Sequence, residues 1–210
     1  MRDVKEFVAG FQRFQSGAIG PDSALFDELR QGQNPRAILI GCSDSRVDPA
    51  ILTDCVPGDL FVVRNVANLV PPCEVDAGYH GVSAALEYAV CHLNVSHVIV
   101  LGHSQCGGIK ALMDGGCSCD EHSFIGRWVN IAEKAKESVL QRLHDKAPAL
   151  QQRACEQASI LLSLENLMTF PWLRQRVEAG SLALHGWYFD LRAGTLSGYT
   201  PATGGFDLLT

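Results

Sequence analysis

Two short segments carry the side chains that could bind a metal ion and do chemistry beside it. The first, from Cys42 to Arg46, reads CSDSR and presents a thiol, a carboxylate and a guanidinium. The second, from His103 to Gly108, reads HSQCGG and supplies an imidazole and another thiol. Two cysteines, one histidine and one aspartate form a ligand set that suits zinc.

Neither segment is strong evidence by itself. A cysteine after an apolar run is more often a small core residue, and a histidine three positions before a cysteine is common by chance. The two segments together are stronger evidence, because Gly107 and Gly108 let the backbone approach a small ligand closely. A helix that begins near Cys106 would also stabilise the thiolate that metal binding requires.

Asp44 could act in either of two ways at such a zinc. It could be a fourth ligand that closes the site, or it could accept a hydrogen bond from a zinc-bound hydroxide and direct the oxygen lone pair at a substrate. Arg46 could hold the carboxylate away from the metal through a bidentate ion pair. The alternative is a structural salt bridge between Asp44 and Arg46 beside an unrelated metal.

The charge of the ligands predicts the preferred pH of such a site. Two thiolates cancel the charge of zinc, so water bound to it is less acidified than water on zinc held by three neutral histidines, where the pKa falls to roughly 7. We therefore expect the site to work best at alkaline pH.

Short apolar runs precede both segments and must position them. Ala37–Gly41 leads into Cys42, and His97–Gly102 leads into His103; each run is typical of a buried strand. Strands that alternate with helices predict an α/β fold with a mostly parallel central sheet flanked by helices. Ligands bind at the carboxyl ends of the strands of such sheets, so residues 61 positions apart (103 − 42) can share one metal.

The rest of the chain predicts an N-terminal helical arm and a C-terminal hairpin around this core. Val4, Phe7, Val8, Phe11 and Phe14 recur at helical spacing and form an apolar face that could pack on the core or on a second copy. We expect one domain over 1–210, with the arm over 1–32 and the zinc-binding core over 33–210. Further predicted elements are helices over 22–30, 77–93, 123–146 and 148–179 (bent at Pro171), strands over 60–63, 182–190 and 195–199, and a loose tail over 201–205.

The composition excludes several classes of partner. The 210 residues are 47% hydrophobic and carry a formal charge of −6, which argues against nucleic acid or an anionic membrane. No run approaches the roughly 20 apolar residues of a bilayer span, and the charged N-terminus is unlike a secretory signal. We therefore expect a cytoplasmic protein. Cys117 and Cys119 lie in a Gly-rich acidic loop and could bind a metal or respond to oxidants, but an ordinary solvent-facing loop is the simplest interpretation.

The two ligand segments, with the stretch from Val62 to Asn68 (VVRNVAN) between them, resemble a β-class carbonic anhydrase. The resemblance runs from about Gln33 to Met113 and resumes more faintly over Leu184–Tyr188. The combination of segments is highly specific, although each piece is not.

The resemblance implies the roles of the site residues and the reaction. Zinc would be bound by Cys42, His103 and Cys106, with Asp44 and Arg46 as the catalytic dyad. Zinc-bound hydroxide would attack carbon dioxide to give bicarbonate and a proton. The residues implied to form the substrate pocket are Gln33, Phe61, Val66, Tyr88 and the backbone of Gly107. The family also implies a homodimer or a higher homo-oligomer, with the pocket completed across the dimer interface and the N-terminal helix wrapping the partner.

One departure from the family concerns the state of the zinc. Some members carry a tryptophan at the position of Leu39, as part of a non-catalytic bicarbonate site that favours Asp-ligated zinc. Because this chain has leucine there, we expect an open site at neutral pH, with Asp44 paired to Arg46 and Asp44 a ligand only in a closed form.

Two other functions remain open at this stage. A related enzyme could use the same zinc to hydrolyse carbonyl sulfide or carbon disulfide, and turnover on the different gases separates it from a carbonic anhydrase. A structural-zinc or redox-sensing protein would have a filled fourth position on the metal and no catalysis.

Overall fold

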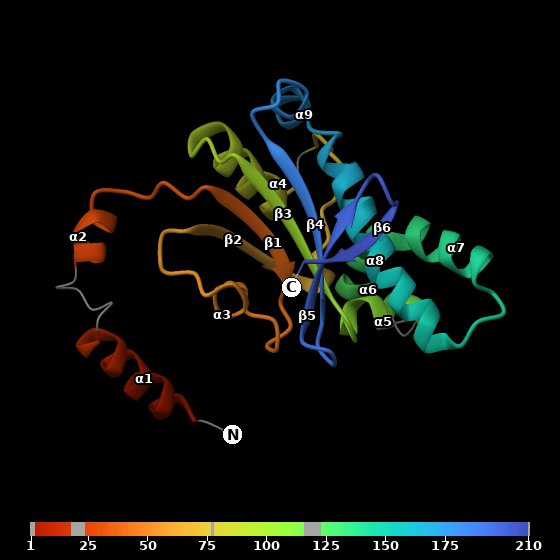
Figure 1. The fold of residues 1–210 in the computed structure, drawn as a ribbon, viewed down its shortest axis with the longest axis horizontal. Coiled ribbons are helices and arrows are strands. Elements are labelled where there is room, and N and C mark those ends of the chain that lie inside the picture. Colours follow the sequence, from red (N-terminus) through yellow and green to blue (C-terminus); the bar gives the residue numbers. More distant parts are fainter. Residues whose placement is uncertain (1–2, 18–23, 77, 116–122, 210) are drawn as a thin grey trace. The chain divides into compact units, whose positions relative to one another are not determined.

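The computed structural model describes residues 3–17, 24–76, 78–115 and 123–209 in two compact units, Met1–Asn34 and Pro35–Thr210 (Figure 1). The N-terminal unit contains helices α1 (Val4–Ser16) and α2 (Ala24–Leu29). Asp3 caps α1, since its carboxylate accepts hydrogen bonds from the backbone N–H groups of Lys5 and Glu6. The phenylalanine-rich helix is therefore present as predicted.

The larger unit is built on a six-stranded sheet with the order β2-β1-β3-β4-β5-β6. The first four strands are parallel, and β5 and β6 continue the sheet in antiparallel fashion after β4. This arrangement confirms the predicted α/β class and the C-terminal hairpin. The strands are β1 (Ala37–Cys42), β2 (Leu60–Asn65), β3 (His97–His103), β4 (Ala183–Asp190), β5 (Thr195–Thr200) and β6 (Gly205–Leu208).

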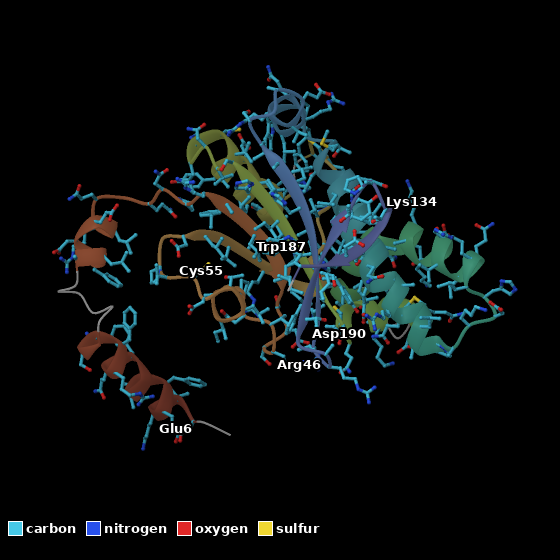
Figure 2. All side chains as sticks on the ribbon, viewed as in Figure 1. Glu6, Arg46, Cys55, Lys134, Trp187 and Asp190 are labelled. Carbon is cyan, nitrogen blue, oxygen red and sulfur yellow. The ribbon has the colours of Figure 1, made fainter. Side chains whose placement is uncertain are left out.

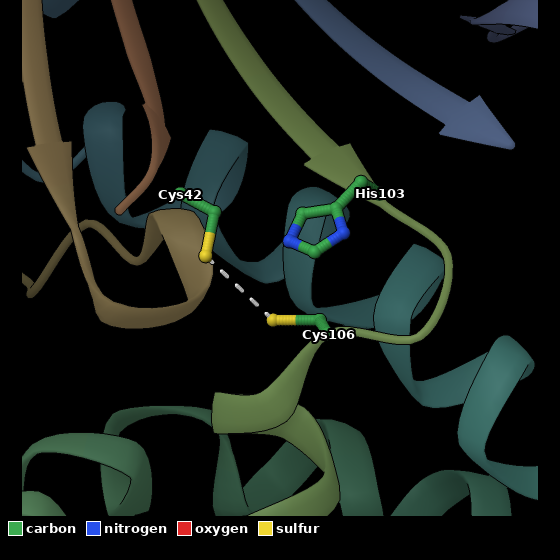
Figure 3. Close-up of side chains that lie close together, drawn as sticks. All are labelled: Cys42, His103 and Cys106. Carbon is green, nitrogen blue, oxygen red and sulfur yellow. Dashed lines mark hydrogen bonds between the residues drawn. The ribbon is translucent and has the colours of Figure 1, made fainter. Parts of the chain in front are cut away.

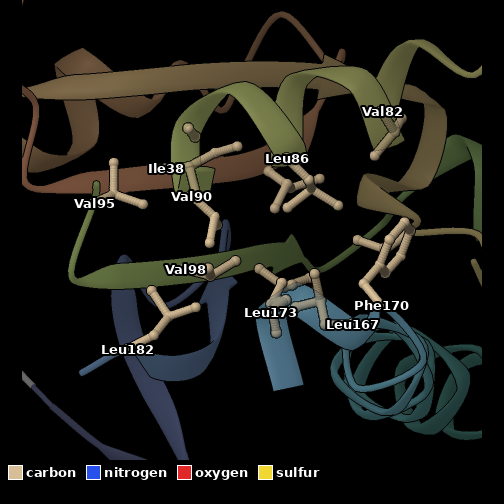
Figure 4. Packing of buried hydrophobic residues seen from close by; sticks show 14 of the residues in the cluster. Ile38, Val82, Leu86, Val90, Val95, Val98, Leu167, Phe170, Leu173 and Leu182 are labelled. Carbon is tan, nitrogen blue, oxygen red and sulfur yellow. The ribbon is translucent and has the colours of Figure 1, made fainter. Parts of the chain in front are cut away.

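The core lies on both faces of the central strands, which explains why their sequences are continuous apolar runs rather than alternating ones. On one face, Ile38 and Val98 pack with Leu86 from α4 (Gly81–Glu87) and with Leu167 from α8 (Pro148–Leu167) (Figure 4). On the other face, a smaller cluster includes Leu39, which is fully buried. The ends of β1 and β3 are therefore held rigidly.

Several helices are shorter than the sequence predicted. The segment 77–93 begins its helix only at Gly81 and ends in a π-helical turn, η2 (Tyr88–His92). Pro171 separates the predicted 148–179 helix into two, because proline lacks an N–H and Phe170 before it is extended. The remaining helices are α3 (Pro49–Thr53), η1 (Val66–Asn68), α5 (Gly107–Met113), α6 (Phe124–Val129), η3 (Asn130–Ala132), α7 (Glu133–Arg142) and α9 (Pro171–Glu178).

The tail over 201–205 was predicted to be loose; 201–204 form a turn, but Gly205 belongs to a strand that the sequence did not predict. Gly205 begins β6, which pairs with β5 in the register Ser197↔Leu208. The strand has only four residues, so its sequence carries too short a pattern to be recognised. Within the described part of the chain, no helix combines the length and the apolar character needed to cross a membrane.

Candidate metal centre

The ends of two neighbouring strands and the start of one helix bring the predicted ligands together. Cys42 is the last residue of β1 and His103 is the last residue of β3, and these strands pair in parallel. Cys106 immediately precedes α5. Figure 3 shows the three side chains converging, and all three residues are buried.

The distances between the donor atoms fit one zinc ion. The ligand atoms of Cys42, His103 and Cys106 all lie within 4.8 Å of one another, and the two sulfur atoms are 3.9 Å apart. A disulfide would need about 2.05 Å. Two sulfurs at about 2.3 Å from one tetrahedral zinc would be about 3.8 Å apart, close to the separation in this protein.

The imidazole of His103 is oriented with one nitrogen free toward the sulfurs. Its Nδ1 lies 2.9 Å from the backbone carbonyl of Ser104, which can only accept, so Nδ1 carries the proton. Its Nε2 is buried and has no hydrogen-bond partner among the described residues. A buried ring nitrogen without a partner is what a neutral histidine ligand presents to a metal.

The two cysteines shift each other's pKa in opposite directions. A hydrogen bond from Cys106 lowers the pKa of Cys42 to about 4, against the opposing effect of burial. The same interaction and burial raise the pKa of Cys106. Burial disfavours the His103 cation, but the neighbouring Cys42 outweighs it and raises the pKa of His103. A divalent cation at this place would favour both thiolates and neutral imidazole.

Asp44 is paired with Arg46 rather than gathered with the three donors. Arg46 Nε donates to Asp44 Oδ1 at 2.9 Å, and its Nη2 donates to Oδ2 at 2.6 Å. The Arg46 guanidinium lowers the pKa of the Asp44 carboxyl well below its usual range. Arg46 also donates to the carbonyl of Gln105, so the pair touches the loop between the other two ligands.

Arg64 of β2 holds the backbone of the Cys42–Arg46 segment through hydrogen bonds. Its Nε donates to the carbonyl oxygen of Cys42 at 2.9 Å, and its Nη2 donates to the carbonyl of Asp44 at 2.7 Å. Its Nη1 forms an ion pair with Asp48 at 2.9 Å. Sequence reasoning missed this role, because a single arginine in a strand carries no sign of which carbonyls it will meet.

The loop from His103 to Cys106 is held in an uncommon conformation next to η1. Gln105 has a φ of 59°, in the left-handed region. Gly108 lies so close to η1 that a Cβ there would be 2.6 Å from Val66 Cγ1 and 2.9 Å from Ala67 Cβ. The glycine therefore allows the start of α5, and Cys106 with it, to approach the rest of the site.

The predicted substrate residues are only partly brought together. The rings of Phe61 and Tyr88 are 5.8 Å apart, and Val66 is partly exposed beside the ligand segments. Gly107 is the exposed first residue of α5. Gln33 is an exposed residue of the N-terminal unit, so its predicted role stays a prediction. Cys117 and Cys119 lie outside the described residues.

One polar residue near the ligands was not anticipated from the sequence. Glu156 of α8 is 3% exposed, and its carboxylate accepts a hydrogen bond from the backbone N–H of Cys106 at 3.1 Å. The helical spacing could have indicated that this glutamate is buried, because Glu156 lies on the same side of α8 as the buried residues Ile160, Ser163 and Leu167.

Comparisons with known proteins agree with this geometry. The family model described as carbonic anhydrase matches residues 37–196. "Beta carbonic anhydrase 5, chloroplastic" from Arabidopsis thaliana is 45% identical over 191 residues, which make up 90% of this chain and 61% of that protein. The chain thus spans less than two thirds of that relative.

Solved structures resemble the whole chain. That of the β-carbonic anhydrase CcaA is similar with a TM-score of 0.91 at 33% identity, covering 98% of this chain and 92% of that one. A structure from a study of two tetrameric β-carbonic anhydrases of Sordaria macrospora has a TM-score of 0.75 at 28% identity and covers 92% of each chain.

Proposed function

The chain belongs to the β-class carbonic anhydrase family, and we propose that it catalyses the reversible hydration of carbon dioxide to bicarbonate and a proton. The observation that carries the proposal is the convergence of Cys42, His103 and Cys106 at the ends of β1 and β3. Bound there, zinc would supply a Lewis acid that lowers the pKa of water and so makes it a nucleophile, with the two thiolate ligands favouring activity at alkaline pH.

The three ligands hold the metal and set its charge. Cys42, His103 and Cys106 would hold zinc as two thiolates and one neutral imidazole, and catalytic zinc sites with three protein ligands keep a further position for water or substrate. The carbonyl of Ser104 keeps the proton of His103 on Nδ1, so Nε2 remains the donor.

Asp44 orients the attacking water. Arg46 engages both carboxylate oxygens, which keeps Asp44 ionised and turned away from the metal ligands. The remaining lone pairs of the carboxylate accept the hydrogen bond of the attacking water and direct its oxygen toward carbon dioxide. The pairing favours the open arrangement, with Asp44 available to substrate water.

The proposed substrate pocket has an apolar wall. Phe61, Val66 and Tyr88 are the residues proposed for that wall, and the backbone N–H of Gly107 is proposed to donate to a substrate oxygen; donation from Gln33 stays a separate prediction. Carbon dioxide carries no net charge, so an apolar wall with a few donors suits it better than a charged pocket.

The active form is a homo-oligomer. The larger unit exposes Val62, Val66 and Tyr88, and apolar surface of this kind is suited to a partner subunit. The Sordaria macrospora relatives are described as tetrameric. A dimer that completes the pocket is the smallest assembly consistent with these features.

Stopped-flow measurement of carbon dioxide hydration tests the proposal. Purified protein is expected to hydrate carbon dioxide, to lose activity when a chelator removes its zinc, and to regain it when zinc is restored. Cys42→Ser and His103→Ala should lack both zinc and activity. Zinc-loaded wild-type protein that leaves carbon dioxide unhydrated but hydrolyses carbonyl sulfide would overturn the substrate, and full zinc content without turnover on either gas would leave a structural site.

A further inference from the structure

A buried carboxylate behind the metal ligands has no part in the proposed reaction. Glu156 lies on the inner side of α8 and is 3% exposed. Removing a carboxylate from water is costly unless hydrogen bonds replace its hydration, so its burial requires specific partners. Those partners identify what the residue does.

Glu156 connects a metal ligand to the sheet. Its Oε1 accepts from the backbone N–H of Cys106 at 3.1 Å and from Gln152 Nε2 at 3.0 Å, and its Oε2 accepts from the hydroxyl of Tyr188 in β4 at 2.8 Å. Burial and the Glu156 carboxylate raise the pKa of Tyr188, so this hydroxyl stays a donor. All three donors are neutral groups that fix the direction of the carboxylate.

The backbone N–H of Cys106 is the group through which Glu156 can fix the position of this ligand. It belongs to the residue that precedes α5, where a helix leaves backbone N–H groups without internal partners. On the other side of the loop, Ser104 is held by β4, since its N–H donates to the carbonyl of Phe189 and its hydroxyl accepts from the N–H of Leu191. The loop between the two ligands is thus anchored at both ends.

We propose that Glu156 is a positioning residue that fixes Cys106 in its metal-binding place, and that Tyr188 orients the Glu156 carboxylate for that purpose. The inference rests on the proposed zinc centre. Outer hydrogen-bond partners of metal ligands typically change metal affinity by about 10- to 100-fold when they are removed. Glu156 contacts the backbone of Cys106 rather than its sulfur, so it influences the position of the thiolate.

Truncation of Glu156 is expected to leave the fold intact. Glu156 and Tyr188 line a cavity of about 250 Å³, whose wall also includes the exposed residues Gln105 and Arg192. Water can enter such a cavity and hydrogen-bond the groups that a shorter side chain leaves free. The effect on metal binding can therefore be measured in a folded protein.

The experiment compares zinc affinity across four variants of the full chain. Metal-free protein is titrated with zinc against a chromophoric chelator, and cobalt(II) is used to read the thiolate-to-metal absorption bands. Glu156→Ala should bind zinc about 10- to 100-fold more weakly and shift the cobalt bands. Glu156→Gln keeps an oxygen that can accept from Cys106 N–H, so it should recover most of the affinity. Tyr188→Phe should weaken binding less than Glu156→Ala does.

Gln151→Ala is the matched control, because Gln151 is on the same helix and, among the residues that the structure describes, its side chain hydrogen-bonds the carbonyl of Leu143 rather than a residue of the site. It should leave zinc affinity and the cobalt bands unchanged. Wild-type affinity and unshifted bands in Glu156→Ala, with only the unfolding free energy reduced, would overturn the inference. If Glu156→Ala fails to fold, a Tyr188→Phe protein with wild-type affinity and bands would overturn it. Wild-type protein that binds no zinc would instead remove the proposed function and this inference with it.

Discussion

At the scale of single residues, the ion pair of Asp44 and Arg46 differs from an ordinary surface pair. The Asp44 side chain is only 16% exposed, while that of Arg46 is 48% exposed. Both carboxylate oxygens are engaged by the guanidinium, and the guanidinium also binds the Gln105 carbonyl in the ligand loop. Ordinary surface ion pairs add little to stability, whereas this partly buried bidentate pair fixes a carboxylate near the ligand loop, which suits a role in the reaction.

Replacement of Asp44 separates metal binding from the chemistry. Asp44→Asn should keep a full complement of zinc, because the other three donors remain, but it should lower the hydration rate by at least about 100-fold, as loss of a proton-accepting group does. Zinc analysis and stopped-flow assays on the same preparation measure both. Ser45→Ala, which changes an exposed neighbour, is the control. Turnover near the wild-type value would remove Asp44 from the mechanism.

The sequence predicted the residues whose side-chain chemistry indicates metal binding or catalysis. It missed the residues that act through contacts with backbone groups. Cys42, His103 and Cys106 could be expected to meet because each adjoins a strand end. Arg64 donates to the carbonyl of Cys42, and Glu156 accepts from the N–H of Cys106. Backbone partners leave no signature in side-chain type, so these contacts required coordinates.

At the scale of elements, the approach of α5 to η1 decides where Cys106 lies. Gly108→Ala would place a Cβ against Val66 and Ala67. Overpacking of this kind costs about 1–3 kcal/mol, and it should also weaken zinc binding by displacing α5. Gly107→Ala is the matched control for stability, since a Cβ there meets nothing within 4 Å.

Urea unfolding of metal-free protein and zinc titration measure the two effects. An unfolding free energy equal to wild type in Gly108→Ala would show that α5 can move away from η1 freely, contrary to the packing described for this site.

The turn after β4 contributes stability that depends on pH. Asp190 accepts from the N–H groups of Ala193 and Arg192, and these bonds lower its pKa, with a contribution from Arg153. The lowered pKa means that the stabilisation is complete above the unfolded pKa of about 4 and is lost as pH falls through the folded value. Figure 2 shows Asp190 at the same end of the sheet as Arg46.

Asp190→Asn should therefore be less stable than wild type by a constant amount between about pH 5 and 8, and the difference should shrink below about pH 4. Urea unfolding of both metal-free proteins over this range provides the comparison. A difference that grows as the pH falls would contradict the lowered pKa.

The elements were predictable where a pattern was long or uniform. Continuous apolar runs marked β1 and β3, and the helical spacing of phenylalanines marked α1. The 123–146 region divides at Asn130, a weak helix former, into α6, η3 and α7. That division and the short β6 depend on contacts distant in sequence, which local patterns do not contain.

At the scale of the whole molecule, the two units each expose apolar side chains. In α1, Phe7 is 64% and Phe11 is 57% exposed. A helix with such a face is stabilised when another surface covers it, and the proposed homo-oligomer would supply that surface.

Phe7→Ser/Phe11→Ser should weaken self-association by at least about 100-fold, since burying each ring stabilises the assembly by about 1.5–3 kcal/mol. Sedimentation equilibrium against protein concentration measures the change. Gln12→Ser, on the same helix, should associate like wild type. A double variant with unchanged association would show that α1 does not form the interface.

The central claim is that Cys42, His103 and Cys106 hold one zinc ion with a position left for chemistry. X-ray absorption at the zinc edge of the purified protein tests it most directly. The account predicts two sulfur neighbours at about 2.3 Å and two nitrogen or oxygen neighbours at about 2.0–2.1 Å. A shell of four sulfurs, or one without sulfur, would contradict the account.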